Sequence, residues 1–427
     1  MATEFKRQQI LDGIYFTEVK NDKFTSNRIS VNLVAPLSLD TASAYALLPL
    51  ILKKGYRECP DFSSFNRALN MLYGAAVDGD VKTFGDCQII TLSIATINDK
   101  YTIDNEEVSL EAAKILSSLV LDPVIENGFF KESVFETEKQ FLIDSIKAEL
   151  NDKGSLALSK CKQIMCSGEP YSISCHGTLE TAESLSLTDV FDHYNTLLQT
   201  AHIEIMFAGS GNADAVREVM FSSFSSCIER EKPFEIKTKI KKPSDQIKRV
   251  TERYSIVQSK LSMGFSVENP ESEKEKHALR YAVALLGGTP FSKLFLNVRE
   301  KLSLCYYCSA SFDSIKNVMF VNSGVEEKNK NKAEEEILNQ LSILKSGDIS
   351  DDEFLNTKKL LNNVLTSTED SISKLERYFL ARIFSGEIIT PEKELEIINS
   401  LTREDIITAA NKIKLDTVYF MAPKEEE

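Results

Sequence analysis

The sequence predicts an α+β fold of two homologous halves, each with antiparallel-rich sheets covered on one face by helices. Within each half, segments with strand-like alternation mix with amphipathic helical segments, without the regular alternation of strand and helix that a parallel sheet requires. Segments far apart in the chain also repeat one another, as in a duplicated domain. The 427 residues are enough for about two to four domains, each with its own core.

Each repeated segment begins with a strand that an apolar helix follows. Residues 26–34 (SNRISVNLV) alternate polar and apolar side chains, which is typical of a half-buried strand, and residues 259–267 (SKLSMGFSV) repeat this pattern. We expect a helix over residues 42–53 after the first strand and over residues 276–286 after the second. A Gly-Gly pair then provides a C-terminal stop signal.

The two halves also end alike, with a helix that leads into a strand. Thr188 and Thr402 are the expected N-caps, because a threonine hydroxyl accepts a hydrogen bond from a free backbone N–H group. The strands follow over residues 202–209 and 417–422. We therefore expect two copies of one domain.

Three further elements of the first half are predicted from periodicity. A helix over residues 61–73 carries apolar side chains at i, i+4 and i+7. A long helix is expected over residues 131–152 and an alternating strand over residues 88–95.

The repeats divide the chain into an N-terminal domain of residues 1–228, a basic linker of residues 229–250 and a C-terminal domain of residues 251–427. The linker is rich in lysine, contains two prolines and has few large apolar side chains, so we expect it to lie on the surface. A strip that binds anions is the alternative for this run of charge.

Charge and composition argue against two classes of partner. The net charge of −14 opposes nucleic-acid binding, which depends on attraction to phosphates. No apolar run reaches the roughly 18 residues of a membrane span, so we expect no membrane association. The N-terminus lacks the apolar core of a signal peptide, and the eight cysteines are dispersed, as in reduced proteins. These features predict a cytoplasmic protein.

Two cysteine pairs, Cys161 with Cys166 and Cys305 with Cys308, are spaced closely enough in the sequence to be considered as metal ligands. A structural zinc site needs four converging ligands, and the four histidines are dispersed. Residues 303–312 look like a strand, in which positions three apart face opposite sides. We therefore predict that Cys305 and Cys308 face opposite sides of the sheet and are structural.

Motifs in both halves carry a family resemblance. Residues 287–307 (GGTPFSKLFLNVREKLSLCYY) combine a small-residue turn, a helix that ends in Arg-Glu-Lys and a strand with Tyr, and residues 52–60 (LKKGYRECP) and 72–76 (LYGAA) add to the match. Over nearly its whole length the chain resembles the insulinase/pitrilysin zinc peptidases, which include the mitochondrial processing peptidase. It is most similar to an inactive bacterial subgroup, the YmfF-like proteins, which are associated with modification of elongation factor P. The resemblance implies metallopeptidase-like chamber halves.

The resemblance also implies that the zinc site is lost. The family binds zinc through a His-x-x-Glu-His helix, in which the Glu is the general base, and through a Glu on a later helix. The two His positions fall on Ala46 and Leu50, the general base on Pro49 and the later ligand on Ser145. We therefore expect no catalytic residue, no metal ligand and no cofactor in this chain, and zinc only in an active partner.

The later ligand position leaves an alternative open. Ser145 lies seven residues after Glu138, which matches a Glu of the family, but Asp144 or Glu149 could be argued as the ligand instead. A lone carboxylate would hold zinc poorly in either case. Glu138 is expected to cap or pair locally.

Arg299 and Tyr306 are the candidate substrate-binding residues. They match an Arg and a Tyr that lie against the substrate in active family members, and they keep the spacing of seven. An arginine fork binds carbonyl or carboxylate groups, and a tyrosine hydroxyl can donate to an oxyanion. The alternative is that Arg299 pairs with an acidic neighbour and Tyr306 fills a strand face.

These observations predict a non-catalytic, substrate-holding or regulatory subunit that acts on a peptide or protein with a homologue carrying His-x-x-Glu-His. The chain would be a hydrolase only as part of that complex. The alternatives are an active zinc-dependent peptidase with unusual ligands and a stand-alone peptide-binding homodimer.

Overall fold

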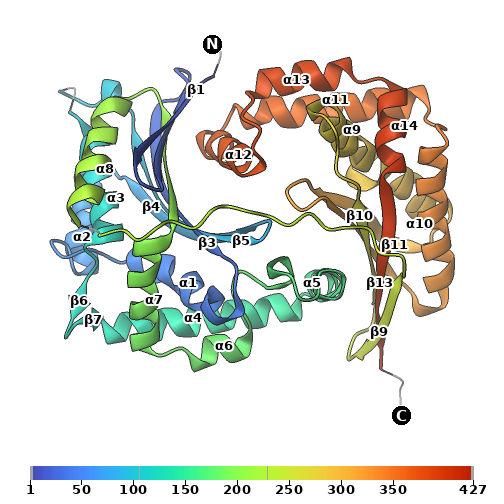
Figure 1. Cartoon of the computed structure of the whole chain (residues 1–427), viewed down its shortest axis with the longest axis horizontal. Helices are drawn as coiled ribbons and strands as arrows, with labels where there is room; N and C mark the ends of the chain where they lie inside the picture. The colour runs from blue at the N-terminus through green and yellow to red at the C-terminus, as the bar shows by residue number, and fades with distance from the viewer. Residues whose placement is uncertain (1–2, 105, 228, 425–427) are drawn as a thin grey trace. The chain divides into compact units, whose positions relative to one another are not determined.

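The computed structural model describes residues 3–104, 106–227 and 229–424, and the chain divides into two compact units (Figure 1). Unit 1 comprises Met1–Lys147, Ile173–Lys237 and Thr368–Thr390, and unit 2 comprises Ala148–Ser172, Thr238–Ser367 and Pro391–Glu427. The predicted domains divide the chain along the sequence, whereas each compact unit also takes one segment from the other half.

Unit 1 is built on a six-stranded sheet with the order β1-β2-β8-β3-β5-β4. Its neighbouring strands are antiparallel except for the parallel pair β2 and β8. The strands are β1 (Glu4–Leu11), β2 (Ile14–Lys20), β3 (Ser26–Pro36), β4 (Ala76–Phe84), β5 (Cys87–Ile97) and β8 (His202–Gly209). A short hairpin of β6 (Ile125–Glu126) and β7 (Phe129–Phe130) is separate from the sheet.

Most helices of unit 1 cover one face of this sheet and enclose the main apolar core. They are α1 (Leu39–Leu52), α2 (Phe62–Met71), α3 (Val108–Leu121), α4 (Glu132–Asn151), α6 (Leu179–Ser184), α7 (Leu187–Thr200) and α8 (Ala213–Cys227), and a 3₁₀ turn, η1, covers Asp99–Tyr101. The opposite face carries α12 (Ile372–Ser385), whose Leu375, Phe379 and Leu380 pack on Val19 and Met206. The last turn of α4 passes into unit 2.

Unit 2 repeats this sheet with the order β11-β12-β10-β13-β9. Its strands are β9 (Lys248–Tyr254), β10 (Ser259–Val267), β11 (Cys305–Asp313), β12 (Val318–Val325) and β13 (Ile413–Pro423). Again only one pair, β9 with β13, is parallel, and it occupies the place of β2 with β8. The predicted fold class and internal duplication are confirmed at the level of topology.

The helices of unit 2 follow the same plan. α9 (Glu273–Val283), α10 (Lys330–Lys345) and α14 (Arg403–Asn411) lie on one side with two π-helices, η3 (Ala284–Gly288) and η4 (Leu294–Lys301). The unit also contains α11 (Asp351–Thr368), α13 (Pro391–Ser400) and the short turns η2 (Pro170–Ser172) and η5 (Glu327–Asn329). The other face of the sheet carries α5 (Lys153–Met165), which packs on β10, β12 and β13.

The predicted elements occur close to their expected bounds, but one predicted N-cap is wrong. Thr402 caps α14 by accepting from the backbone N–H of Asp405 at 3.3 Å, as expected. In α7 the cap is Ser186, whose hydroxyl accepts from the backbone N–H of Asp189 at 3.1 Å. Thr188 lies inside the helix, because the aspartate that completes the capping box is three residues after Ser186.

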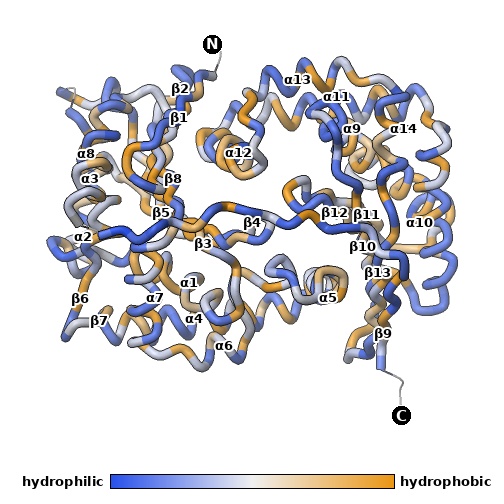
Figure 2. The backbone as a smooth tube through the Cα atoms, viewed as in Figure 1, coloured by the Kyte–Doolittle hydropathy of each residue, from blue (hydrophilic) through white to orange (hydrophobic). Residues whose placement is uncertain are grey.

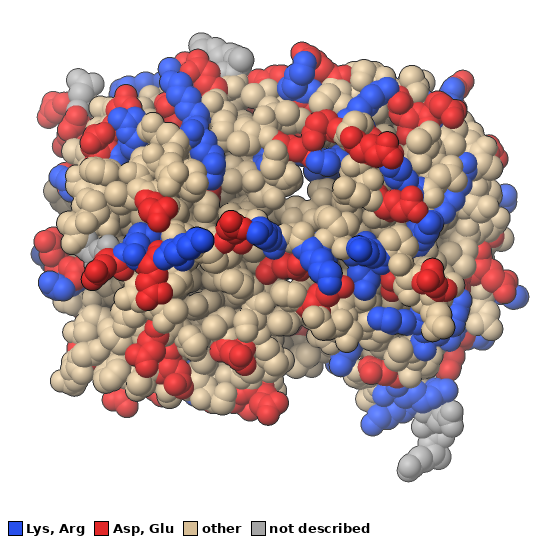
Figure 3. Space-filling view, viewed as in Figure 1, with Lys and Arg blue, Asp and Glu red and all other residues tan. Residues whose placement is uncertain are grey.

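The predicted linker has no helix or strand over residues 229–247, and β9 begins at Lys248. In Figure 2 this segment is mainly hydrophilic with short hydrophobic stretches, and its Phe234 and Ile236 pack against apolar clusters of unit 1. Figure 3 shows basic and acidic side chains interspersed on this face. Lys237 pairs with Glu235, which suits a solvated linker. None of the helices formed by the described residues is long and apolar enough to cross a membrane.

Candidate functional site

The helix α1, which occupies the place of the metal-binding helix, is almost wholly buried in unit 1. It begins after Ser38, whose side chain accepts a hydrogen bond from the backbone N–H of Asp40 at 3.4 Å. Ala46 is 2% exposed, Pro49 is buried and Leu50 is partly buried against the core. Their side chains supply a methyl group, a ring without N–H and an isobutyl group, so none has a lone pair for a metal ion.

The strand β4 packs directly on Pro49. A β-carbon added to Gly79 of β4 would lie 2.6 Å from the carbonyl oxygen of Pro49 and 3.0 Å from its Cβ. Only glycine fits without a shift of the backbone at this close approach. The side of α1 that carries Pro49 is therefore filled by strand backbone.

The later ligand position is satisfied within its own helix. Ser145 of α4 donates from Oγ to the carbonyl oxygen of Phe141 at 2.8 Å. Asp144 is exposed and accepts from Nε2 of Gln140 at 3.0 Å, and Glu149 is exposed. Among the residues that the structure describes, no three His, Cys, Asp or Glu ligand atoms that include a residue of α1 or α4 converge. The side chains present do not fit a zinc ion.

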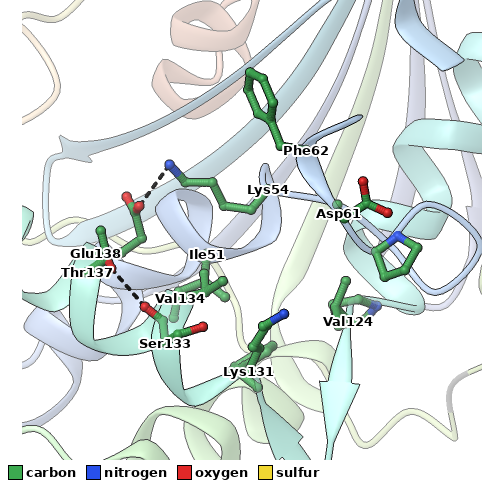
Figure 4. A pocket seen from close by; sticks show the side chains of 14 residues that line it. Ile51, Lys54, Asp61, Phe62, Val124, Lys131, Ser133, Val134, Thr137 and Glu138 are labelled. Atoms are coloured by element: carbon green, nitrogen blue, oxygen red, sulfur yellow. Dashed lines mark hydrogen bonds and ion pairs between the residues drawn. The ribbon is translucent and has the colours of Figure 1, made fainter. Parts of the chain in front are cut away.

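Glu138, which precedes Ser145 by two turns of α4, is held by a local ion pair. It is 7% exposed, and its Oε1 lies 2.8 Å from Nζ of Lys54, just after the end of α1. The prediction that Glu138 pairs locally is confirmed. Figure 4 shows the two side chains pointing toward each other.

This ion pair lies in the wall of a pocket of ≈ 420 Å³ within unit 1 (Figure 4). The wall is mainly apolar, with Ile51, Phe62 and Val134 among its side chains, and it also includes the ammonium group of Lys131. The sequence analysis did not predict this pocket. Its residues come from several separate segments that no local pattern connects.

Arg299 and Tyr306 line one pocket of ≈ 420 Å³ in unit 2. The side chain of Arg299, in the last turn of η4, is 41% exposed, with its guanidinium 4.6 Å from the ring centroid of Phe295. Its Nε lies 3.3 Å from Oε1 of Glu300. Tyr306, at the start of β11, is 60% exposed. The structure thus brings the two candidates together, and their contact with a peptide stays a prediction.

Tyr306 is exposed because a β-bulge lies between Cys305 and the next paired residue of β11. Cys305 and Cys308 pair with Val325 and Ser323, which are two residues apart on β12 and therefore share a face. The prediction that the two cysteines face opposite sides is wrong. The extra residue in the bulge shifts the strand's alternation by one position.

The two thiols interact directly, and their surroundings shift their pKa values in opposite directions. A hydrogen bond from the Cys308 thiol lowers the pKa of Cys305 to about 7, helped by the Ser323 hydroxyl and the charge of Arg299, although burial acts the other way. The hydrogen bond to Cys305 and burial raise the pKa of Cys308 well above its ordinary value. Near neutral pH Cys305 is therefore partly thiolate, and Cys308 stays a donor.

The fold and the site define a metallopeptidase-like protein whose metal-binding positions cannot hold zinc. The sequence model of the family described as Peptidase M16 inactive domain matches residues 184–361. The protein named "Probable inactive metalloprotease YmfF" from Bacillus subtilis (strain 168) is 29% identical over 407 residues, which cover 95% of each chain. Part of the chain thus resembles the insulinase/pitrilysin, or M16, peptidase family, and nearly its whole length is similar to a protein named as a probable inactive metalloprotease.

Solved structures share this fold. The crystal structure of a conserved protein from Enterococcus faecalis V583 superposes with a TM-score of 0.91 at 25% identity, covering 99% of each chain. A protease from Helicobacter pylori has the same fold, with a TM-score of 0.81 at 16% identity over 99% of this chain and 100% of its own.

Proposed function

We propose that this chain is the substrate-holding subunit of a heteromeric peptidase, in which a homologue carrying His-x-x-Glu-His supplies the zinc. One contrast carries this proposal. On α1 the metal-binding positions carry side chains without ligand atoms, and on α4 the hydroxyl of Ser145 is hydrogen-bonded to its own helix. By contrast, Arg299 and Tyr306 are exposed in one pocket.

The chemistry of the two side chains suits peptide binding. The guanidinium of Arg299 can donate to backbone carbonyl oxygens or to a carboxylate. The side chain of Tyr306 is 60% exposed, and its hydroxyl can donate to an oxygen that gains charge during cleavage. In the complex these residues would hold the peptide and the partner's zinc would activate water.

Association with a partner is tested by native mass spectrometry and zinc analysis. The purified chain should contain far less than one zinc per molecule and should cleave no peptide. After it is mixed with a His-x-x-Glu-His homologue from the same genome, a species with the summed mass and chelator-sensitive cleavage should appear. A chain that binds stoichiometric zinc and cleaves peptides alone, or that never associates with the homologue, would contradict the proposal. A homodimer mass without the partner would support the stand-alone alternative.

The role of the two side chains is tested in the active complex. Tyr306→Phe and Arg299→Gln should each lower kcat/KM by about tenfold or more, since loss of one oxyanion donor typically costs at least that much. Tyr101→Phe is the matched control, because Tyr101 is an exposed tyrosine of unit 1 outside the pocket. Equal activity of all three variants would remove these residues from the proposal.

Two further predictions accompany this function. A cytoplasmic location follows from composition, and the association with modification of elongation factor P follows from the family resemblance. Co-purification of elongation factor P with the complex, or its cleavage by the complex, would test the second.

A further inference from the structure

The cysteine pair of β11 combines three properties that the other described thiols do not share. Cys305 and Cys308 lie on one face of the strand, their thiols are hydrogen-bonded, and Cys305 lines the pocket that contains Arg299. By contrast Cys87 and Cys161 do not line this pocket, and burial raises the pKa of both thiols. Position in the fold therefore singles out Cys305 for reaction with a solute.

We propose that Cys305 and Cys308 form a redox-active pair, in which a hydroperoxide oxidises Cys305 and Cys308 resolves the product to an intramolecular disulfide. The geometry supports both steps. The pocket gives a small hydroperoxide access to Cys305, which is only 9% exposed. The bulge places the second thiol on the same face of β11 as Cys305.

The chemistry balances in two steps. The Cys305 thiolate attacks one peroxide oxygen, so that an S–O bond forms and the O–O bond breaks, and the alkoxide takes up a proton and leaves as the alcohol. The sulfur of Cys308 then attacks the sulfur of the Cys305 sulfenic acid. An S–S bond forms, the S–O bond breaks and the hydroxyl leaves as water with the Cys308 proton. Two thiols are oxidised by two electrons, and the hydroperoxide is reduced to alcohol and water.

Disulfide closure would act on the pocket. The closed loop contains Tyr306, the bulged residue, and Tyr307, which packs beside Gly324 of β12. A covalent bond between the two sulfur atoms would constrain the backbone of the bulge, and we expect it to change the direction of Tyr306. Oxidation would then alter the surface that we propose for peptide binding. The thiol chemistry does not depend on that function.

Peptide mass mapping tests the pair in the full-length protein. Trypsin releases both cysteines, and no others, in the peptide 302–316 (LSLCYYCSASFDSIK). The reduced chain is treated with hydrogen peroxide, alkylated and digested. We expect this peptide to lose two hydrogen atoms and to escape alkylation, while the half-buried Cys59 and Cys175 are still alkylated. Oxidation of Cys59 or Cys175 at the same rate as Cys305, or overoxidation of Cys305 without a disulfide, would overturn the proposal.

Variants separate the roles of the two thiols. In Cys308→Ser a sulfenic acid should accumulate on Cys305 and be trapped by a dimedone reagent. In Cys305→Ser, Cys308 should stay reduced at the same peroxide concentration. Arg299→Gln should slow oxidation of Cys305 severalfold, because it removes a cation that stabilises the thiolate. The matched control is Lys301→Gln, which removes an equal charge from the same helix outside the pocket. Equal slowing in both variants would contradict a local effect of Arg299.

Discussion

Single residues show that the lost metal site has been rebuilt as ordinary packing. On α1, Pro49 packs against the backbone of β4 at Gly79, a position where a side chain would clash with Pro49. On α4, Ser145 donates a hydrogen bond to a backbone carbonyl of its own helix, and Glu138 forms an ion pair with Lys54. Each of these side chains has a packing, hydrogen-bond or ion-pair partner in the same unit. The site is therefore a stable part of the core, and a single substitution would not restore metal binding.

The ion pair of Lys54 with Glu138 provides a first prediction. Lys54→Met leaves a carboxylate that is nearly buried without its cation, so we expect a loss of about 1 kcal/mol in the free energy of unfolding, lessened because Lys54 is partly exposed. Adding Glu138→Gln to Lys54→Met should recover most of the loss. Urea denaturation of the three proteins provides the measurement.

The control for this prediction is Lys131→Met. Lys131 also contributes to the pocket wall, but it pairs at 3.4 Å with Glu126, which is exposed. Its loss should change stability by less than about 0.5 kcal/mol. Equal destabilisation by both lysine variants would mean that burial of the Glu138 carboxylate is not the cause.

The ionisation of Cys305 provides a second prediction. The thiolate is the nucleophile, and its fraction rises with pH through a pKa of about 7, so alkylation by iodoacetamide should be half-maximal near pH 7. The charged side chains that line the pocket with it are Arg299, Glu300 and Glu326. Cys308→Ala removes the hydrogen-bond donor and should move the midpoint to higher pH. A wild-type midpoint near the ordinary value of about 8.5 would contradict this.

Sequence reasoning at this scale predicted that Glu138 caps or pairs locally, but it did not predict the contact of the two cysteines. A strict alternation of strand faces separates residues three apart, and the bulge at Tyr306 breaks that alternation. One signal was present. Cys308, Ala310 and Phe312 are apolar in one phase of the strand, whereas Cys305 is in the other. Such a change of phase is what an inserted residue produces.

At the scale of helices and strands, local sequence patterns predicted the elements well. They predicted less well which sheet each helix packs on. Alternation and capping residues act within a few residues, so β3, β10 and α14 were predictable. The sheet that a helix covers depends on distant contacts. The attachment of α5 to the sheet of unit 2 and of α12 to that of unit 1 had no local signal.

The packing of α12 on the sheet of unit 1 provides a third prediction. Phe379 is fully buried, and its ring stacks on that of Phe5 with centroids 4.8 Å apart. Phe379→Ala removes a large buried side chain and should lower the free energy of unfolding by about 3 kcal/mol or more. Phe141→Ala, at an exposed position of α4, should change it by less than about 0.5 kcal/mol. If thermal denaturation shows similar losses for both variants, α12 does not stabilise unit 1.

The whole molecule is a duplicated fold in which each compact unit is completed by a helix from the other half of the sequence. Apart from β1, which has no counterpart in the sheet of unit 2, the two sheets share one strand order and one parallel pair. This shared order explains why internal comparison of the sequence revealed the duplication. The exchange of α5 and α12 makes the two halves interdependent. A division of the chain at the linker would separate each sheet from one of its covering helices.

This interdependence provides the last prediction. A fragment of residues 1–228 lacks α12, so that an apolar surface around Val19 and Met206 is uncovered. A fragment of residues 251–427 lacks α5, so that Phe320 is exposed. Each fragment alone should bind a hydrophobic dye and be cleaved rapidly by protease, because such a surface is unstable in water. Mixing the two fragments should restore protection, since each supplies the helix that the other lacks. If either fragment alone is monomeric, dye-free and as resistant as the intact chain, the exchanged helices are dispensable and the halves fold independently.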